Sequence, residues 1–303
     1  LGTDERMFAA KVQIKVLNQT NTNDSFYKGR FAPSATGDLH MGSLVTSLAC
    51  ALDTYHNKGS WLIRIDDIDH TRCSQASSLS ITQVLEHYFS DLPYSHIYHQ
   101  SDTRSLYIKE FNRLASESLV YQCSCSRKDI TALQQSQGTH LCRDKLISEF
   151  RDDTQDILRF KSSCTSLDEQ LIEDAILFRR DGCFSYHFSC VVNDEYDDIT
   201  HIIRGADLMD AEQPQAQLIK ALGFRKLQYH YVPLIKNKSG QKLSKQNKAL
   251  PITMSDDAPL TLRAALRHLQ WSPNSLKSMP AENSIKALLN WAAKNWQPNL
   301  NFI

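Results

Sequence analysis

Residues 27–52 consist of two apolar runs separated by a polar loop, a pattern typical of an α/β fold. Residues 27–31 form a short run rich in aromatic side chains, as in a buried strand. Leu44, Leu48 and Leu52 then recur at every fourth position, as on one face of a helix. The stretch between them, RFAPSATGDLHMGSL at 30–44, is rich in turn-forming residues. The pattern therefore predicts a strand, a loop and a helix in that order.

The predicted loop has the properties of a phosphate-binding loop. Gly37 and Gly42 let the backbone approach a ligand closely. The first turn of the following helix, where His40 lies, offers unpaired N–H groups and the positive end of the helix dipole to an anion. The alternative is an ordinary strand-to-helix connection in which His40 only caps or packs, because motifs this short also arise by chance.

A second apolar run, WLIRIDDID at 61–69, is predicted to be a strand that ends in a carboxylate cluster, Asp66, Asp67 and Asp69. Carboxylates at the carboxyl end of a strand in an open α/β sheet lie where such sheets bind ligands, and they could receive a substrate ammonium group. The alternative is a solvated acidic turn in which Asp69 caps the next element.

A lysine-rich loop is predicted at 235–250, IKNKSGQKLSKQNKAL. Its KLSK segment places Lys242 and Lys245 three positions apart, with an apolar residue and a hydroxyl between them. Ammonium groups in a flexible loop can meet a polyphosphate, although most such runs are solvated surface. Beyond this loop, the apolar spacing predicts two helices, at 260–269 and 284–296.

Composition indicates a soluble globular protein that contains one large domain with insertions, or two domains. The chain has 303 residues, of which 41% are hydrophobic and 22% charged. No apolar run approaches the length of a membrane span and no signal-peptide pattern is evident, so we expect a cytoplasmic protein that does not contact a membrane. The formal net charge is zero, so a nucleic-acid partner would have to be bound by local patches.

Four motifs, RFAPS, HxGS, RIDDID and KLSK, occur in this order and together resemble a known family. HMGS and KLSKQ resemble the HIGH and KMSKS signatures of class I aminoacyl-tRNA synthetases, with Ser43 in place of the final His. RFAPSATGDLHMGSL, LIRIDDID, FRRDGCFSYHFSCVVNDEYDDITH and IIRGADL resemble the glutamyl branch, over about residues 27 to 250. The resemblance implies a doubly wound, Rossmann-type α/β catalytic domain with a parallel sheet, a zinc-bearing insertion and a small helical C-terminal part.

The resemblance also implies an L-glutamate pocket in which Asp66 faces the substrate ammonium. Glutamate has two carboxylates, which suit the fork of arginine. For Arg204, the alternative is a surface ion pair with Asp207 or Asp210. Two departures stand out: the family usually has glutamate at position 66, and proline where this chain has Ala35. The implied pocket residues are Arg30, Phe31, Ala32, Pro33, Ser34, Asp66, Tyr186 and Arg204.

The implied chemistry is adenylation, in which the substrate α-carboxylate attacks the α-phosphate of ATP and pyrophosphate leaves. The enzyme has to position the reactants and stabilise charge on the phosphates. His40 and Lys245 are the candidates for that stabilisation, with Lys242 in support, and Mg²⁺ would screen the pyrophosphate. The implied ATP-binding residues are His40, Gly42, Ser43, Lys242, Ser244 and Lys245.

Only some fifty residues follow KLSKQ, too few for an anticodon-binding domain. The chain thus resembles the glutamyl-queuosine tRNA(Asp) synthetases, a paralogous family that activates glutamate without tRNA and attaches it to the queuosine base at the wobble position of tRNA(Asp). One alternative is a truncated glutamyl-tRNA synthetase that charges a tRNA 3′ end. Another is a decayed module that only binds nucleotide or RNA, and a cytidylyltransferase-like enzyme is a more distant one. We expect a monomer.

Three of the eight cysteines lie in one short segment, CSCSRKDITALQQSQGTHLCR at 123–143. Thiolates bind zinc tightly, and a structural zinc would stabilise an insertion too small for its own core. Cys123, Cys125 and Cys142 are the candidate ligands. The tyrosine ligand of the paralogous family is not evident, so His140 is the candidate fourth ligand. The alternative is three reduced thiols. We interpret the other cysteines as core or surface thiols: Cys50, Cys73, Cys164, Cys183 and Cys190.

The predicted organisation has five parts, of which the first is a poorly ordered extension that includes a possible vector remnant, LGTDER. The others are two halves of the catalytic domain, the insertion between them, and a C-terminal part with the KLSKQ loop. Their ranges are 1–24, 25–118 (first half), 119–175 (insertion), 176–230 (second half) and 231–303.

Overall fold

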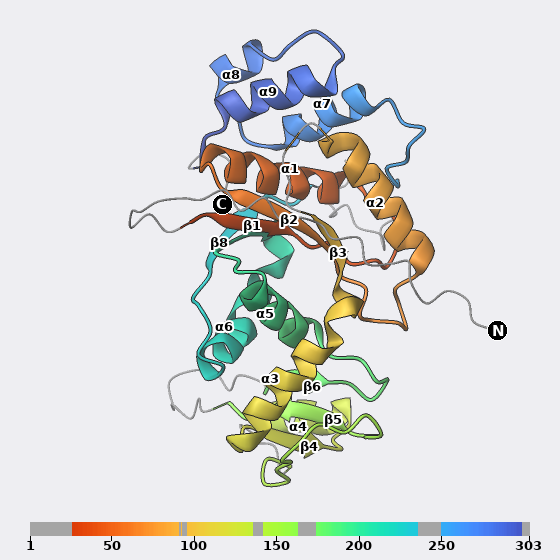
Figure 1. Ribbon diagram of the computed structural model, residues 1–303, viewed down its shortest axis with the longest axis vertical. Helices are drawn as coiled ribbons and strands as arrows, with labels where there is room; N and C mark the ends of the chain where they lie inside the picture. Colours follow the sequence, from red (N-terminus) through yellow and green to blue (C-terminus); the bar gives the residue numbers. More distant parts are fainter. Residues whose placement is uncertain are drawn as a thin grey trace, which may run out of the picture.

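A five-stranded parallel sheet forms the centre of the molecule (Figure 1). The computed structural model describes residues 26–90, 92, 96–135, 142–162, 174–235 and 250–298, so the predicted N-terminal extension, 1–24, lies outside the described residues. The strand order is β3-β2-β1-β7-β8, and every neighbouring pair is parallel, which confirms the predicted fold class. The strands are β1 Lys28–Phe31, β2 Ser60–Ile65, β3 Ile97–His99, β7 His201–Gly205 and β8 Gln228–Val232.

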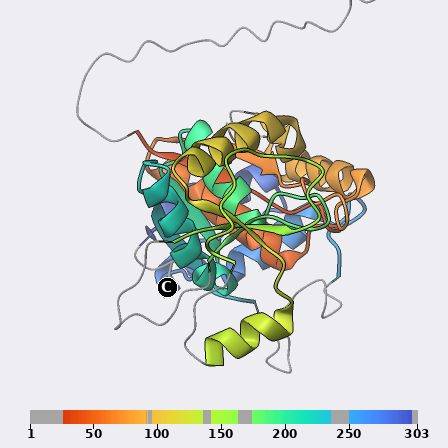
Figure 2. The ribbon, with the colours of Figure 1, turned by 90° about the horizontal axis from the view of Figure 1, so that it is seen from below.

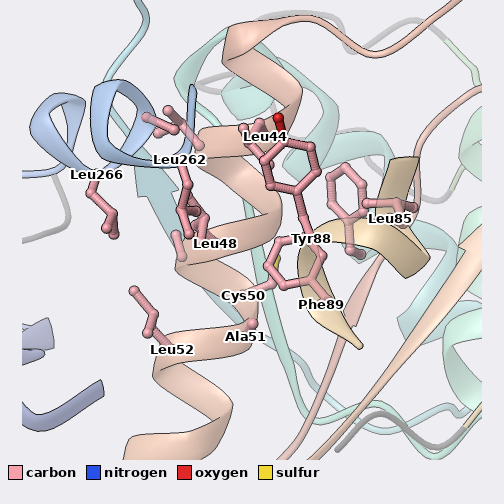
Figure 3. Packing of buried hydrophobic residues seen from close by; sticks show 14 of the residues in the cluster. Leu44, Leu48, Cys50, Ala51, Leu52, Leu85, Tyr88, Phe89, Leu262 and Leu266 are labelled. Carbon is pink, nitrogen blue, oxygen red and sulfur yellow. The ribbon is translucent and has the colours of Figure 1, made fainter. Parts of the chain in front are cut away.

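One face of the sheet is covered by α1, whose apolar face has the predicted spacing. Leu44, Leu48 and Leu52 are fully buried, and they lie between the sheet and the C-terminal helices (Figure 3). Helices α7 and α9 pack on α1 and confirm the two helices predicted near the C-terminus. The helices on this side are α1 Met41–His56, α2 Gln75–Phe89, α7 Ala258–His268, α8 Pro273–Lys277 and α9 Ile285–Asn295.

A buried carboxylate ties the C-terminal helices to α1. Asp53 accepts a hydrogen bond from Trp296 Nε1 at 2.9 Å and another from Tyr27 Oη at 2.5 Å. Since Asp53 is 2% exposed, both bonds lie away from water.

None of the helices in the described ranges has both the length and the apolar character needed to cross a bilayer.

The other face of the sheet is covered by helices that connect it to the insertion. A second core, rich in phenylalanine, lies between these helices and the insertion; it includes Phe111, Phe178, Phe184 and Phe188. The helical elements here are η1 Gln100–Thr103, α3 Arg104–Ser116, α5 Tyr186–Tyr196, η2 Ala206–Ala211 and α6 Glu212–Ala221.

A three-stranded antiparallel sheet lies at the opposite end of the molecule from helices α7, α8 and α9 (Figure 1). Two of its strands belong to the predicted insertion, and the third begins at Ile176, the first residue of the predicted second half of the catalytic domain. The strands of this sheet are β4 Val120–Cys123, β5 Ile157–Phe160 and β6 Ile176–Phe178. Helix α4, Arg127–Gln135, follows β4 and lies outside the outline of the main body in the view from below (Figure 2). The domain ranges given above remain predictions.

Candidate active site

A pocket of about 390 Å³ opens at the carboxyl ends of the central strands. It lies where the chain order of the sheet reverses, because β1 has β2 on one side and β7 on the other. Open α/β sheets bind their ligands at this switch point. The wall is formed by the ends of β1, β7 and β8, the residue after β2, the start of α1, and α5.

All the predicted pocket residues in the described part of the chain line this single cavity. They come from segments up to 174 positions apart, counted from Arg30 to Arg204. Lys242, Ser244 and Lys245 lie outside the described residues, as does His140. The structure thus brings together the following predicted residues: Arg30, Phe31, Ala32, Pro33, Ser34, His40, Gly42, Ser43, Asp66, Tyr186 and Arg204.

His40 caps helix α1 at the pocket. It has extended backbone angles, and its Nδ1 accepts a hydrogen bond from the backbone N–H of Gly42 at 3.0 Å. A Cβ atom at position 42 would lie 2.9 Å from His40 Cε1, so any residue other than glycine would displace the imidazole from this position. This contact gives a physical reason for the His-x-Gly spacing. The capping alternative for His40 is therefore correct as local structure, and it is compatible with a position facing phosphate.

The lysine-rich segment begins and ends at the same pocket. Ile235, the last described residue before it, lines the cavity. After it, the backbone N–H of Ile252 donates to Leu39 O at 2.7 Å, and Pro251 forms an antiparallel bridge with His40. One flank of residues 236–249 therefore lines the pocket, and the other is hydrogen-bonded to the residues that lead into α1.

A buried chain of charged side chains lies next to the pocket, and two of its members, Arg30 and Asp66, line the cavity. The guanidinium of Arg30 contacts Asp194 with two bonds, Nε to Oδ1 and Nη2 to Oδ2, both at 3.0 Å. Arg64 contacts the same carboxylate through Nη1 at 2.8 Å, and its Nε contacts Asp66 Oδ1 at 2.7 Å. Charges can be buried in this way because each faces an opposite charge and a hydrogen-bond partner.

Asp66 is a buried member of this chain and not part of a solvated turn. Its second oxygen, Oδ2, accepts a weak hydrogen bond from the thiol of Cys190 at 3.6 Å. Burial raises the pKa of Asp66, and the attraction of Arg64 opposes that rise without cancelling it. Burial also raises the pKa of Cys190 to about 12, so this thiol stays protonated and can donate. Asp66 thus lines the pocket, and its carboxylate is held in place by Arg64 and Cys190.

The other two carboxylates of the RIDDID stretch have structural partners. Asp67 accepts hydrogen bonds from the backbone N–H and the hydroxyl of Ser101, at 2.8 and 3.0 Å. Asp69 accepts from Thr71 Oγ1 at 2.6 Å and from Arg72 Nε at 2.7 Å. The cap of α2 is Ser74, so the alternative reading of Asp69 as a helix cap is wrong.

Arg204 has a different environment from Arg30. It is 3% exposed and donates to two neutral groups, Gln215 Oε1 at 2.8 Å and Tyr231 Oη at 3.1 Å. Its guanidinium also lies over the ring of Tyr229, 4.6 Å from the centroid. Within the described ranges no carboxylate forms a salt bridge with it, so the alternative of a surface ion pair is not found. Its buried Nε has no hydrogen-bond partner there either.

One face of α5 contributes three residues to the site, and sequence reasoning identified only the first. Tyr186, Cys190 and Asp194 are spaced four apart, which places them on one side of a helix. Tyr186 and Cys190 line the cavity, and Asp194 lies behind it, bonded to Arg30. Cys190 was interpreted as a core or surface thiol; it is buried, and it also lines the pocket. The regular spacing from Tyr186 is the signal that could have identified both missed residues.

The three clustered cysteines are brought together at the end of β4. The Sγ atoms of Cys123, Cys125 and Cys142 all lie within 4.8 Å of one another, and Cys125 and Cys142 are 3.7 Å apart. Two of the thiols are buried and one is half-buried, as expected for a closed structural site. The arrangement fits three ligands of a tetrahedral zinc ion.

Comparison with known proteins agrees with this geometry. The model of tRNA synthetases class I (E and Q), catalytic domain, matches residues 27–163 and 155–298. A glutamyl-Q tRNA(Asp) synthetase of Acinetobacter baylyi is 36% identical over 290 residues, which cover 90% of this chain and 93% of that protein. A protein of the same name from Pectobacterium atrosepticum is 34% identical over 289 residues, covering 90% and 86%.

A solved structure shares the fold. It is a glutamate tRNA ligase from Elizabethkingia meningosepticum in complex with its amino acid, and it superimposes with a TM-score of 0.68 at 22% identity. The superposition covers 91% of this chain and 66% of that chain, so this chain spans less than two thirds of its length.

Proposed function

Because this chain belongs to the class I tRNA synthetases of the E and Q group, and within them to the glutamyl-Q tRNA(Asp) synthetases, we propose that it activates L-glutamate with ATP and transfers the glutamyl group to queuosine. The acceptor is the queuosine base at the wobble position of tRNA(Asp). Activation takes place without tRNA, and a cytoplasmic monomer performs both steps.

The observation that carries this proposal is the environment of Arg204. Its guanidinium is buried in the pocket wall and has only neutral partners in the described part of the chain. A buried cation without a counter-ion favours a ligand that supplies a carboxylate. Arg30, whose charge is shared with Asp194, lines the same cavity and serves the second carboxylate. A glutamine side chain would leave the Arg204 charge unbalanced, which explains how glutamine is rejected.

The ammonium group of glutamate is received by Asp66. Its carboxylate is held by Arg64 and Cys190 and still forms part of the cavity wall, so it can accept a further hydrogen bond. Aspartate is one methylene shorter than the glutamate usual in the family, so the substrate ammonium sits deeper, close to the end of β2.

The nucleotide occupies the part of the cavity beside α1. The α-carboxylate oxygen of glutamate forms a bond to the α-phosphorus of ATP, the bond from that phosphorus to the bridging oxygen breaks, and pyrophosphate leaves with the electron pair. His40 and the N–H groups of the first turn of α1 stabilise the negative charge that develops on the phosphates. Lys245, with Lys242 and Ser244, reaches the same phosphates from a segment that has one flank in the pocket wall and the other hydrogen-bonded to the residues that lead into α1.

The proposal includes two metal ions, one that acts on the nucleotide and one that is structural. Mg²⁺ neutralises phosphate charge and arrives with the nucleotide, bound mainly through phosphate oxygens. Zinc is held by Cys123, Cys125 and Cys142, with His140 as the fourth ligand, and stabilises the insertion.

The test is glutamate-dependent ATP–pyrophosphate exchange by the purified chain without RNA. Labelled glutamate is then offered to tRNA(Asp) with and without queuosine. We expect exchange without RNA, no exchange with glutamine, and transfer only to the queuosine-containing tRNA. A requirement for tRNA in the exchange, with transfer to a 3′ end, would favour the truncated glutamyl-tRNA synthetase. Absence of exchange under all conditions would indicate a module that only binds nucleotide or RNA.

A further inference from the structure

Asp194 is the central member of the buried chain of charged side chains, and it lies behind the cavity without lining it. Its Oδ1 accepts from Arg30 Nε at 3.0 Å and from Arg64 Nη1 at 2.8 Å, and its Oδ2 accepts from Arg30 Nη2 at 3.0 Å. Asp194 is 2% exposed, and both arginines are buried with it. One carboxylate therefore connects the arginine of β1 to the arginine of β2.

The bonds to Asp194 determine which edge of Arg30 faces the ligand. They use Nε and Nη2, and Nη1 forms no hydrogen bond with the described residues. Because Arg30 lines the pocket, the Nη1 edge is the one available to a substrate carboxylate. Arg64 differs, since its Nε, Nη1 and Nη2 all have protein partners.

Without Asp194, Arg30 would have no carboxylate partner among the described residues, whereas Arg64 would keep Asp66 and Asp197. The positive charge of Arg64 also repels Arg30, and both arginines are removed from water. Burial alone would raise the pKa of Asp194, but Arg30 and Arg64 outweigh it and hold that pKa below its usual value. The Asp194 carboxylate is therefore ionised in the folded enzyme at neutral pH.

We propose that Asp194 is a positioning residue of the glutamate site. It holds Arg30 so that one edge is presented to a substrate carboxylate, and it holds Arg64 so that Asp66 is presented to the ammonium. This inference rests on the proposed function. Asp194 touches neither substrate, and it acts entirely through the two arginines.

Asp197 provides a matched control on the same helix end. It contacts Arg64 Nη1 at 3.4 Å, accepts from Tyr98 Oη at 2.6 Å, and forms no bond with Arg30 among the described residues. Its side chain is 15% exposed, compared with 3% for Asp194. Asp197→Asn therefore removes a carboxylate from the neighbourhood of Arg64 without releasing Arg30.

The experiment compares Asp194→Asn and Asp197→Asn in ATP–pyrophosphate exchange, with glutamate and ATP varied separately. We expect Asp194→Asn to raise the KM for glutamate up to about a hundredfold, because small displacements of binding groups have effects of this size. The KM for ATP should stay within about twofold, since the helix terminus beside His40 is not part of the charged chain. Asp197→Asn should raise the KM for glutamate less than about threefold.

If Asp194→Asn does not fold, Asp194→Glu keeps the charge and displaces the carboxylate by one methylene. It should still raise the KM for glutamate selectively. A glutamate KM equal to that of the Asp197→Asn variant, or an equal rise in the KM for both substrates, would overturn the inference. Failure of the proposed function has a different signature, because the wild-type chain would then show no glutamate-dependent exchange and no stabilisation by L-glutamate in thermal denaturation.

Discussion

Gly42 lies directly beneath the imidazole of His40, and a Cβ atom there would approach His40 Cε1 to 2.9 Å. The same glycine donates the backbone hydrogen bond that orients the imidazole, at 3.0 Å. Position 42 therefore controls where the histidine at the start of α1 can lie.

Gly42→Ala should separate activity from stability. Alanine displaces the imidazole, so we expect glutamate-dependent exchange to fall at least about tenfold, as it does when a positioned catalytic group is lost. The variant should unfold at nearly the wild-type temperature, because the better helix propensity of alanine, about 1 kcal/mol, offsets the lost cap. Exchange assays and thermal denaturation measure both quantities. His56→Ala, at the exposed far end of α1, is the control, and equal activity in the wild-type protein and the two variants would contradict the prediction.

Arg204→Gln should specifically weaken glutamate binding. The substitution keeps a hydrogen-bonding side chain and removes the cation that has only neutral partners among the described residues. We expect the KM for glutamate to rise about a hundredfold or more, because a buried carboxylate would lose its charge partner. Tyr231→Phe, which removes one donor–acceptor contact to the same guanidinium, should have an effect below about tenfold. A normal glutamate KM in Arg204→Gln would exclude Arg204 from carboxylate recognition.

The pH dependence of glutamate use should report on Asp66. Its pKa is raised above the usual 3.8, mainly by burial, so Asp66 takes up a proton at a higher pH than an exposed aspartate would. Only the ionised form attracts the substrate ammonium, so kcat/KM for glutamate should fall as the pH is lowered, and the fall should begin at a higher pH than an exposed aspartate would give. Asp66→Asn should lower kcat/KM severely and remove this part of the profile. Parallel pH profiles for the two proteins would count against the role of Asp66.

Removal of the Asp53 carboxylate should loosen the C-terminal helices. Asp53→Ala leaves the Trp296 and Tyr27 donors unpaired in the interior, and we expect a loss of about 2 to 4 kcal/mol in the free energy of unfolding. Asp210→Ala, at an exposed position, should change it by less than about 0.5 kcal/mol. Urea denaturation of the two variants provides the comparison, and equal stabilities would show that the buried contacts contribute little.

The metal content of the purified protein should depend on the cysteine cluster. We expect about one zinc ion per chain, and its loss in Cys125→Ser, because three cysteine ligands converge at this position. Cys73→Ser, outside the cluster, should retain the metal. Metal analysis together with thermal denaturation tests this, and unchanged zinc content in Cys125→Ser would leave three reduced thiols as the interpretation.

Local patterns in the sequence were sufficient for the elements around the candidate phosphate loop, for the strand that ends just before Asp66 and for two C-terminal helices. The four-residue spacing of Leu44, Leu48 and Leu52 predicts the buried face of α1, and the structure confirms it. The position of His40 at a helix terminus was likewise visible, because loop and helix are adjacent in the chain. The short α8 was not predicted, since one turn and a half carries too little periodicity.

The partners of the charged groups were decided by tertiary structure alone. Arg30 and Asp194 are hydrogen-bonded although they are 164 positions apart in the sequence, and Trp296 and Asp53 are hydrogen-bonded at a separation of 243 positions. No local pattern specifies such pairs, because they depend on which strands become neighbours and on which helix face covers them. Thus the sequence by itself determined the strand, loop and helix around His40, the strand before Asp66, two C-terminal helices and, through the family resemblance, most of the pocket residues. Only the fold decided that Arg30 shares its charge with a buried carboxylate while Arg204 has neutral partners in the described part of the chain, since that difference depends on what lies within a few ångströms of each guanidinium.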